Sequence, residues 1–189
     1  MDIMPDEIKI EESKPKEPEI KENSFWEFIK VVIISLVIVI PIRTYIAQPF
    51  IVEGDSMDPN FHDGEYLIID ELSYYFKAPQ RGEVIVFRYP RNPSDFFIKR
   101  IIGLPGETVE IKNNDVFIDN KLMGESYLPP DFKTGPDGTI KLPENQYFVM
   151  GDNREHSSDS RFWGLLPKKN ITGRVFVRLW PINKAGIVN

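Results

Sequence analysis

Residues 95–103 read DFFIKRIIG, a run of large apolar side chains interrupted by two adjacent cations. Aromatic and β-branched residues at this density predict a β-strand. Because successive side chains of a strand point to opposite faces, Lys99 shares its face with Phe97 and Ile101. Arg100 then lies on the other face. A lysine among such neighbours either carries its ammonium group out to solvent or loses its charge through desolvation, and only a neutral lysine can act as a base.

Short runs of the same kind recur on both sides of this one, each bounded by Gly, Pro, Asn or Asp. They predict strands at residues 50–53, 65–70, 83–88, 96–103, 108–112, 115–118, 146–150 and 173–179. Beyond residue 46 no segment has sustained helical periodicity, and one short helical turn is expected at 72–76. The predicted fold class is therefore mostly β, an antiparallel sheet domain over residues 47–189. Residues 113–145, rich in Pro and Gly, predict a small loop-rich insertion in it.

Two segments of different character precede the β region. Residues 1–24 carry eight Asp or Glu, four Lys and three Pro, a composition that predicts a disordered tail. Residues 25–46 contain the uncharged block VVIISLVIVI, extended by apolar and aromatic residues on both sides. About 20 such residues span the ~30 Å hydrocarbon core of a bilayer, so we expect a transmembrane helix over 25–46.

A cleaved signal peptide and a buried core helix are the alternatives for this segment. Bulky Tyr45 and nearby Pro49 disfavour cleavage after Ala47. A buried core helix is not normally apolar on every face. Basic residues are more numerous before the apolar block, where Lys9, Lys14, Lys16, Lys21 and Lys30 lie, than just after it, where Arg43 lies. By the positive-inside rule this predicts a cytoplasmic tail and a β domain on the outer face of the plasma membrane.

Charge and cysteine content exclude several classes of protein. The net charge is −6, and no basic patch indicates a nucleic-acid partner. The chain has no cysteine, so it has neither a disulfide framework nor a thiolate metal site. Its two histidines have no paired ligand spacing, and no metal site is expected.

Two other runs stand in a fixed order with the lysine strand. Residues 53–60 read EGDSMDPN and place Ser56 on a tight turn after a predicted strand. Residues 151–161 read GDNREHSSDSR, a run dense in hydrogen-bonding groups. Ser56 and Lys99 are 43 positions apart, so only the folded chain could join them as nucleophile and base. Alone, a serine in a turn is usually only a turn residue, and the combination is far more specific.

The three runs together resemble the type I signal peptidases, serine endopeptidases with a Ser-Lys dyad, over about residues 50–180. The resemblance implies that Ser56 is the nucleophile, that Lys99 is the base and that Ser157 orients the lysine amine. It implies no cofactor. The residues that it implies as structural charge pairs are Arg100, Asp152, Asp159 and Arg161.

The resemblance also implies substrates and partners: exported preproteins cut after small side chains, and the lipid bilayer. The substrate would lie extended between the strand that ends at Gly54 and the strand that carries Lys99. Candidates for contact with it are Val52, Gly54, Met57, Phe97 and Ile98. The sequence departs from the family at Gly54, where some members have a hydroxyl that stabilises the oxyanion, and at Asn60, where Thr is frequent.

Three other functions compete with this interpretation. A Ser-His-Asp triad would use His156, which lies between two aspartates in the polar run. A self-cleaving regulator of the SOS-repressor type shares the Ser-Lys dyad, but the predicted anchor and the missing DNA-binding domain argue against it. An inactive membrane-tethered β domain could bind exported chains without cutting them.

Overall fold

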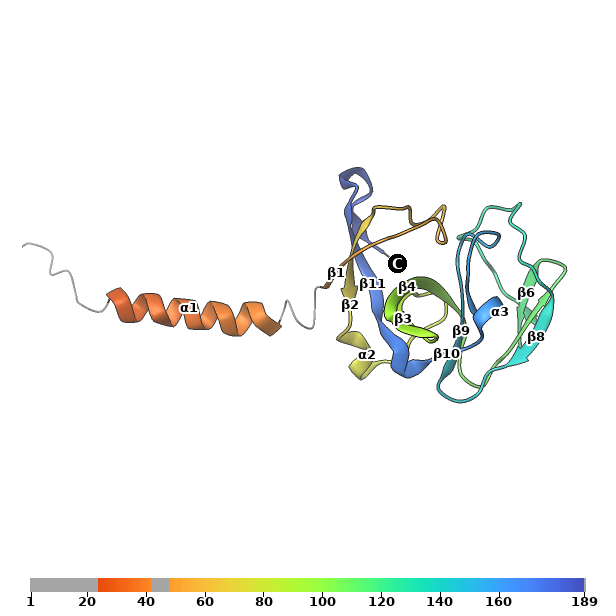
Figure 1. Cartoon of the computed structure of the whole chain (residues 1–189), viewed down its shortest axis with the longest axis horizontal. Helices are drawn as coiled ribbons and strands as arrows, with labels where there is room; N and C mark the ends of the chain where they lie inside the picture. Colours follow the sequence, from red (N-terminus) through yellow and green to blue (C-terminus); the bar gives the residue numbers. More distant parts are fainter. Residues whose placement is uncertain (1–23, 42–47, 189) are drawn as a thin grey trace, which may run out of the picture. The chain divides into compact units, whose positions relative to one another are not determined.

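The structure is a computed structural model that describes residues 24–41 and 48–188. Helix α1 occupies Ser24–Pro41 (Figure 1). Its large apolar side chains from Phe25 to Ile40 are mostly exposed. Nearly all of the predicted tail, and residues 42–46 of the predicted membrane helix, lie outside the described residues. In the described part of the chain, no helix has both the length and the apolarity to cross a membrane. The chain divides into two compact units after Ile38, so the β domain is considered by itself.

The β domain is made of short strands and single helical turns. Its strands are β1 Gln48–Ile51, β2 Tyr66–Asp70, β3 Val84–Tyr89, β4 Asn92–Gly103, β5 Thr108–Lys112, β6 Asp115–Ile118, β7 Lys121–Leu122, β8 Gly138–Lys141, β9 Gln146–Met150, β10 Leu166–Pro167, β11 Ile171–Trp180 and β12 Gly186–Ile187. Its helical turns are α2 Ser73–Phe76, α3 Ser160–Trp163, η2 Lys168–Asn170 and η3 Ile182–Lys184.

The strands form two sheets with antiparallel pairing throughout. The larger has the order β1-β2-β11-β3-β4-β9-β10, with β12 paired to β11. The smaller has the order β7-β6-β5-β8, and Figure 1 shows β6 and β8 at the end of the domain opposite β1 and β2. The prediction of a mostly β, antiparallel fold is confirmed. The smaller sheet includes β5, so it begins before the insertion expected at 113–145.

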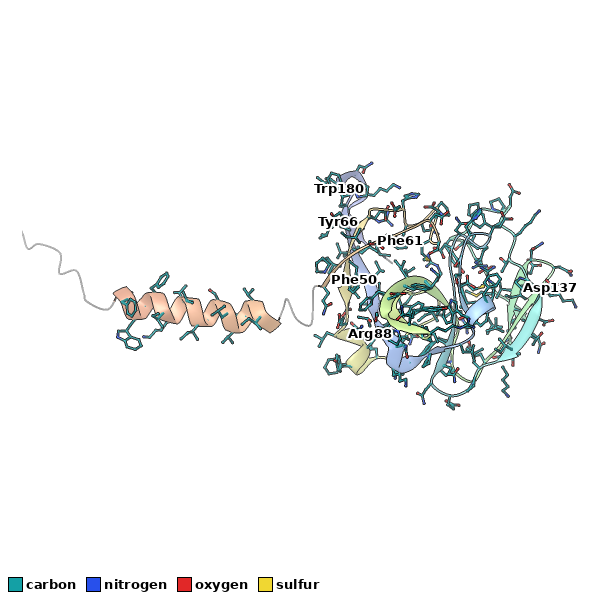
Figure 2. The ribbon with its side chains drawn as sticks, in the orientation of Figure 1. Phe50, Phe61, Tyr66, Arg88, Asp137 and Trp180 are labelled. Carbon is teal, nitrogen blue, oxygen red and sulfur yellow. The ribbon has the colours of Figure 1, made fainter. Side chains whose placement is uncertain are left out.

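The larger sheet curls so that its first strand approaches β4. These strands are separated in the sheet order by β2, β11 and β3, yet the rings of Phe50 on β1 and Phe96 on β4 lie 5.3 Å apart, edge to face. Figure 2 labels Phe50, which lies on β1. Strand β4 pairs with β3 over most of its length but with β9 only from Arg100 onward. One backbone edge of β4 before Arg100 therefore faces β1 across a gap rather than a neighbouring strand.

All eight predicted strands are present, with ends shifted by at most four residues. The strands predicted at 108–112, 115–118 and 146–150 have the predicted bounds. The sequence did not predict β7, β8, β10, β12 or α3. These are elements of two to four residues that exist because a neighbour supplies their hydrogen bonds, as β5 does for β8. Helix α3 is instead begun by the Asp159 side chain, which accepts a hydrogen bond from the Arg161 N–H.

Gly173 is where the larger sheet tolerates no side chain. A Cβ at this position would lie 2.6 Å from Ile69 Cγ2 and 2.7 Å from the Asp70 carbonyl oxygen. Because the backbone of β2 cannot yield, we expect Gly173→Ala to lower the free energy of unfolding by about 1 to 3 kcal/mol. Urea unfolding followed by tryptophan fluorescence measures this. Gly138→Ala is the matched control, since a Cβ there meets nothing within 4 Å. Equal stability of the two variants would contradict the packing at β11.

Candidate active site

Ser56 lies on the loop between β1 and β2, which is held by backbone hydrogen bonds at its ends and by buried side chains at its centre. The Val52 N–H donates to the Glu65 carbonyl and the Gly64 N–H to the Val52 carbonyl, both at 2.9 Å. At the centre the side chains of Met57 and Phe61 are buried in the core. Figure 2 labels Phe61 on this loop. The loop is thus a fixed part of the domain, with Ser56 half-buried at its turn.

The lysine amine and the serine hydroxyl are in direct contact. Lys99 Nζ lies 2.6 Å from Ser56 Oγ and 2.8 Å from the Ile98 carbonyl oxygen, and donates to both. The Lys99 side chain is only 4% exposed although it carries an amine. The amine lies over the face of the Phe97 ring, with Nζ 5.5 Å from the ring centroid.

Burial changes the acid–base behaviour of this amine. Desolvation lowers the pKa of Lys99 from 10.5 to about 8, against the opposing effect of the Asp159 and Asp152 carboxylates, which raise it. The net change corresponds to about 3 kcal/mol favouring the neutral amine relative to a lysine in water. Lys99 can therefore accept a proton near physiological pH, which an ordinary surface lysine cannot.

The polar run that follows β9 holds its two aspartates in buried ion pairs. The Asp152 carboxylate accepts from Arg100 Nε at 2.8 Å and from Arg100 Nη2 at 2.6 Å. Asp159 accepts from Arg161 in the same two-pronged way, at 2.8 and 2.7 Å, and also from the Gly151 N–H. Both carboxylates are fully buried. Each is therefore neutralised by a paired guanidinium, the geometry that buried charges require.

Ser157 lies beside Ser56, and its hydroxyl makes no hydrogen bond with Lys99. A Cβ on Gly151 would come within 2.2 Å of Ser157 Oγ and 2.3 Å of the Ser56 carbonyl oxygen, so both flank this glycine. Ser157 Oγ is buried and has no hydrogen-bond partner among the described residues. The hydroxyl is next to the Ser56 backbone and is unused by the fold.

A cavity of about 480 Å³ opens beside the serine and the lysine. Its walls come from the facing strands β1 and β4, and its lining residues are Phe50, Ile51, Val52, Glu53, Ser56, Leu67, Val86, Phe96, Phe97, Ile98, Lys99 and Ser158. Three of the predicted substrate contacts, Val52, Phe97 and Ile98, are among them.

The other two predicted contacts do not line this cavity. Met57 is fully buried, because the turn after Ser56 directs its side chain into the core. Gly54 has a φ of +82°, and its N–H donates to Asp63 Oδ1 at 2.7 Å. Gly54 therefore shapes the loop, and a residue with a side chain would be strained in that conformation.

Sequence reasoning missed the aromatic pair Phe50 and Phe96. It also missed Asn60 and Asn153, which hold the loop between β1 and β2 that carries Ser56. Asn153 donates from its backbone N–H to the Ser56 carbonyl and from its side chain to the Asp55 carbonyl, both at 3.1 Å. Asn60 donates to Asp152. The position of Asn153 inside the polar run was the available signal. No local pattern indicated the cross-cavity contact of the two phenylalanines.

His156 is not part of a triad in this structure. It is exposed, and in the described part of the chain its ring makes no hydrogen bond with Ser56 or with either neighbouring aspartate. Those carboxylates are occupied by arginines. The Ser-His-Asp alternative therefore has no support in the geometry.

Comparison with known proteins places the chain in a family. Residues 25–180 match the family described as "Signal peptidase, peptidase S26". A probable signal peptidase I-2 from Synechocystis is 38% identical over 98% of this chain and 86% of its own length. Signal peptidase I S from Bacillus subtilis is 39% identical over 87% of this chain and 94% of its own. A solved signal peptidase I from Enterococcus faecalis is 35% identical, with a TM-score of 0.47 over 52% of this chain and 97% of that one. The chain belongs to the signal peptidase family.

Replacing Asp152 tests how much the free energy of unfolding depends on the buried ion pair with Arg100. In Asp152→Ala the Arg100 guanidinium, 7% exposed, loses its carboxylate, and we expect the free energy of unfolding to fall by about 3 to 5 kcal/mol. Denaturant unfolding checks this, with Asp137→Ala as the control at an exposed position. Arg100→Met combined with Asp152→Leu should recover much of the loss, because neither position then carries an unpaired buried charge. A loss no larger than that of the control would contradict the pairing.

Proposed function

We propose that this chain is a serine endopeptidase that removes N-terminal signal peptides from exported preproteins with a Ser-Lys dyad. Its relatives are named signal peptidase I. The observation that carries the proposal is the 2.6 Å hydrogen bond between Ser56 Oγ and a lysine amine whose burial lowers its pKa to about 8. Membership of the family gives the activity, and this contact gives its chemistry.

In the proposed mechanism the neutral Lys99 amine takes the proton of the Ser56 hydroxyl as the oxygen attacks the scissile carbonyl. The tetrahedral intermediate collapses when the ammonium returns this proton to the leaving amine, leaving an acyl-serine. Lys99 then deprotonates a water that attacks the ester, which frees the signal peptide and restores the serine. The Ser56 N–H, which donates no hydrogen bond among the described residues, is a donor for the oxyanion.

Ser157 is proposed as the hydroxyl that orients the Lys99 amine during this cycle. Two facts support the proposal: Ser157 Oγ is buried without a partner, and it adjoins the Ser56 backbone across Gly151. A buried hydroxyl without a hydrogen bond is costly to the fold, which favours a functional use. Asp152 and Asp159 with their arginines would support the dyad without entering the reaction.

The cavity between β1 and β4 is the proposed site for the residues before the cut. An extended chain there would pair with the free backbone edge of β4. Alternate side chains of an extended peptide face the same side, so its first and third residues before the scissile bond would both face the cavity wall. We propose that small side chains such as Ala are preferred at these positions. Val52, Phe97 and Ile98 are proposed contacts.

The family's signal peptidases I are membrane-anchored, and we propose a single anchor over residues 25–46 for this chain. The exposed apolar side chains around α1 support it, because a helix that is apolar on every face needs an apolar environment. We further propose a cytoplasmic tail and a β domain on the outer face of the plasma membrane. Exported preproteins would then meet the dyad as they emerge.

Substitutions at the dyad test the chemistry. Ser56→Ala, Lys99→Ala and Lys99→Arg should abolish cleavage of a labelled preprotein while the protein stays folded, since a guanidinium does not deprotonate. Ser157→Ala should lower kcat at least about tenfold, as expected for one lost hydrogen bond. His156→Ala is the matched control and should keep most activity. Turnover by Ser56→Ala would overturn the dyad, and a loss in His156→Ala alone would indicate a histidine base. No cleavage by the unaltered protein would indicate an inactive binding domain.

The pH profile tests the state of the lysine. Lys99 must be neutral to act, so kcat/KM should rise about tenfold per pH unit below its pKa and level off above it. With a pKa of about 8, the bend should fall near pH 8. A rate still rising to pH 10 would indicate an ordinary lysine, and the base would have to be sought elsewhere.

Protease protection tests the proposed topology. Protease added to intact cells should reach the region after Gln48 and spare an epitope placed before Ser24. Opening the cells should expose both. Digestion of the epitope in intact cells, with the β domain protected, would reverse the orientation.

A further inference from the structure

Asn60 lies on the loop between β1 and β2 that carries Ser56, called the nucleophile loop below. From there it contacts three other parts of the domain. Its side-chain amide donates to Asp152 Oδ2 at 2.8 Å and to the Tyr127 carbonyl at 2.9 Å. Its own carbonyl accepts from Arg178 Nη2 at 2.6 Å. One asparagine thus ties the nucleophile loop to the polar run, to the segment after β7 and to β11.

Two partners of Asn60, Asp152 and Tyr127, are also partners of Arg100. The Asp152 carboxylate that accepts from Asn60 is held by the Arg100 guanidinium, and this guanidinium lies 4.1 Å from the centroid of the Tyr127 ring. Arg100 is the neighbour of Lys99 on β4. The loop is therefore joined to two consecutive residues of one strand: Ser56 to Lys99 directly, and Asn60 to Arg100 through Asp152.

This second connection matters because no strand pairing fixes the loop against β4. The loop connects β1 to β2, and β11 and β3 lie between β2 and β4 in the sheet. The distance between Ser56 Oγ and Lys99 Nζ therefore depends on the contacts that the loop makes outside the sheet. Asn153 supplies two from the polar run, through its backbone N–H and its side chain, and Asn60 supplies another, which leads back to β4 through Asp152 and Arg100.

We propose that Asn60 is a positioning residue that holds the nucleophile loop against β4, through Asp152 and Arg100, so that Ser56 stays within hydrogen-bond distance of Lys99. The inference rests on the proposed Ser-Lys function. Only the amide NH₂ of Asn60 can do this, because Asp152 and the Tyr127 carbonyl are both acceptors. The contacts made by Asn153 remain when Asn60 is replaced, so the expected defect is partial.

The test compares Asn60→Ala and Asn60→Asp in the full-length protein in detergent, with a labelled preprotein as substrate. Asn60→Asp keeps the shape of the side chain but sets a second carboxylate against Asp152. We expect kcat to fall about 10- to 100-fold in both variants, with the larger loss in Asn60→Asp and a KM within about threefold of the original. Asn170→Ala and Asn170→Asp are the matched controls, because the Asn170 amide also donates to a carbonyl, that of Arg88, and neither residue lines the cavity.

The pH profile separates positioning from a general loss of stability. When the loop loosens, water reaches Lys99 and Asp152 is left with fewer donors, and both changes favour the charged amine. The bend in kcat/KM should therefore move above its original pH in the Asn60 variants and stay in place in the Asn170 variants. Thermal unfolding sets the assay temperature at which every variant is folded.

A kcat in both Asn60 variants equal to that of the unaltered protein would overturn the inference. So would a loss of activity that equals the unfolded fraction of each variant, with the bend in the pH profile of kcat/KM unmoved. A failure of the proposed function has a different signature: Ser56→Ala would then cleave the preprotein, or the unaltered protein would not.

Discussion

The structure depends chemically on keeping the Lys99 amine out of water while leaving it in contact with Ser56. Burial makes the charged amine unfavourable, and the Asp159 and Asp152 carboxylates oppose this effect of burial. Each carboxylate is also bound by an arginine through two hydrogen bonds, Asp152 by Arg100 and Asp159 by Arg161. The ion pairs thus stabilise the polar run without cancelling the effect of desolvation on the lysine.

The two members of the proposed dyad come from different kinds of structure. Lys99 is carried by a strand whose pairing with β3 fixes its backbone, whereas Ser56 is carried by a loop that does not pair with that strand. Met57 and Phe61 hold this loop from below by burial, and Asn60 and Asn153 hold it from the side by hydrogen bonds. A sheet that curls until β1 faces β4 then leaves room for an extended peptide beside both residues.

The sequence was sufficient where local pattern determines structure and insufficient where distant segments do. Alternation along residues 96–103 predicted that Lys99 shares a face with apolar side chains, because a strand has a fixed period of two. The inward direction of Met57 has no such period, since it follows from the conformation of a turn. The contact between Phe50 and Phe96 depends on the curl of the whole sheet, and β8 depends on the hydrogen bonds of β5. The sequence marked Asn60 only as a departure from the family pattern, and only the fold brings Asp152 to it.

The most direct test of this account is the ionisation of Lys99 itself, independent of turnover. NMR titration of the isotope-labelled lysine side chains in Ser56→Ala, with Lys99→Arg to assign the signal, follows the amine through its change of charge. The account predicts that the Lys99 amine titrates at about 8. Titration of Lys99 at its ordinary value of 10.5 would contradict the account, because a lysine that is charged at physiological pH cannot activate Ser56.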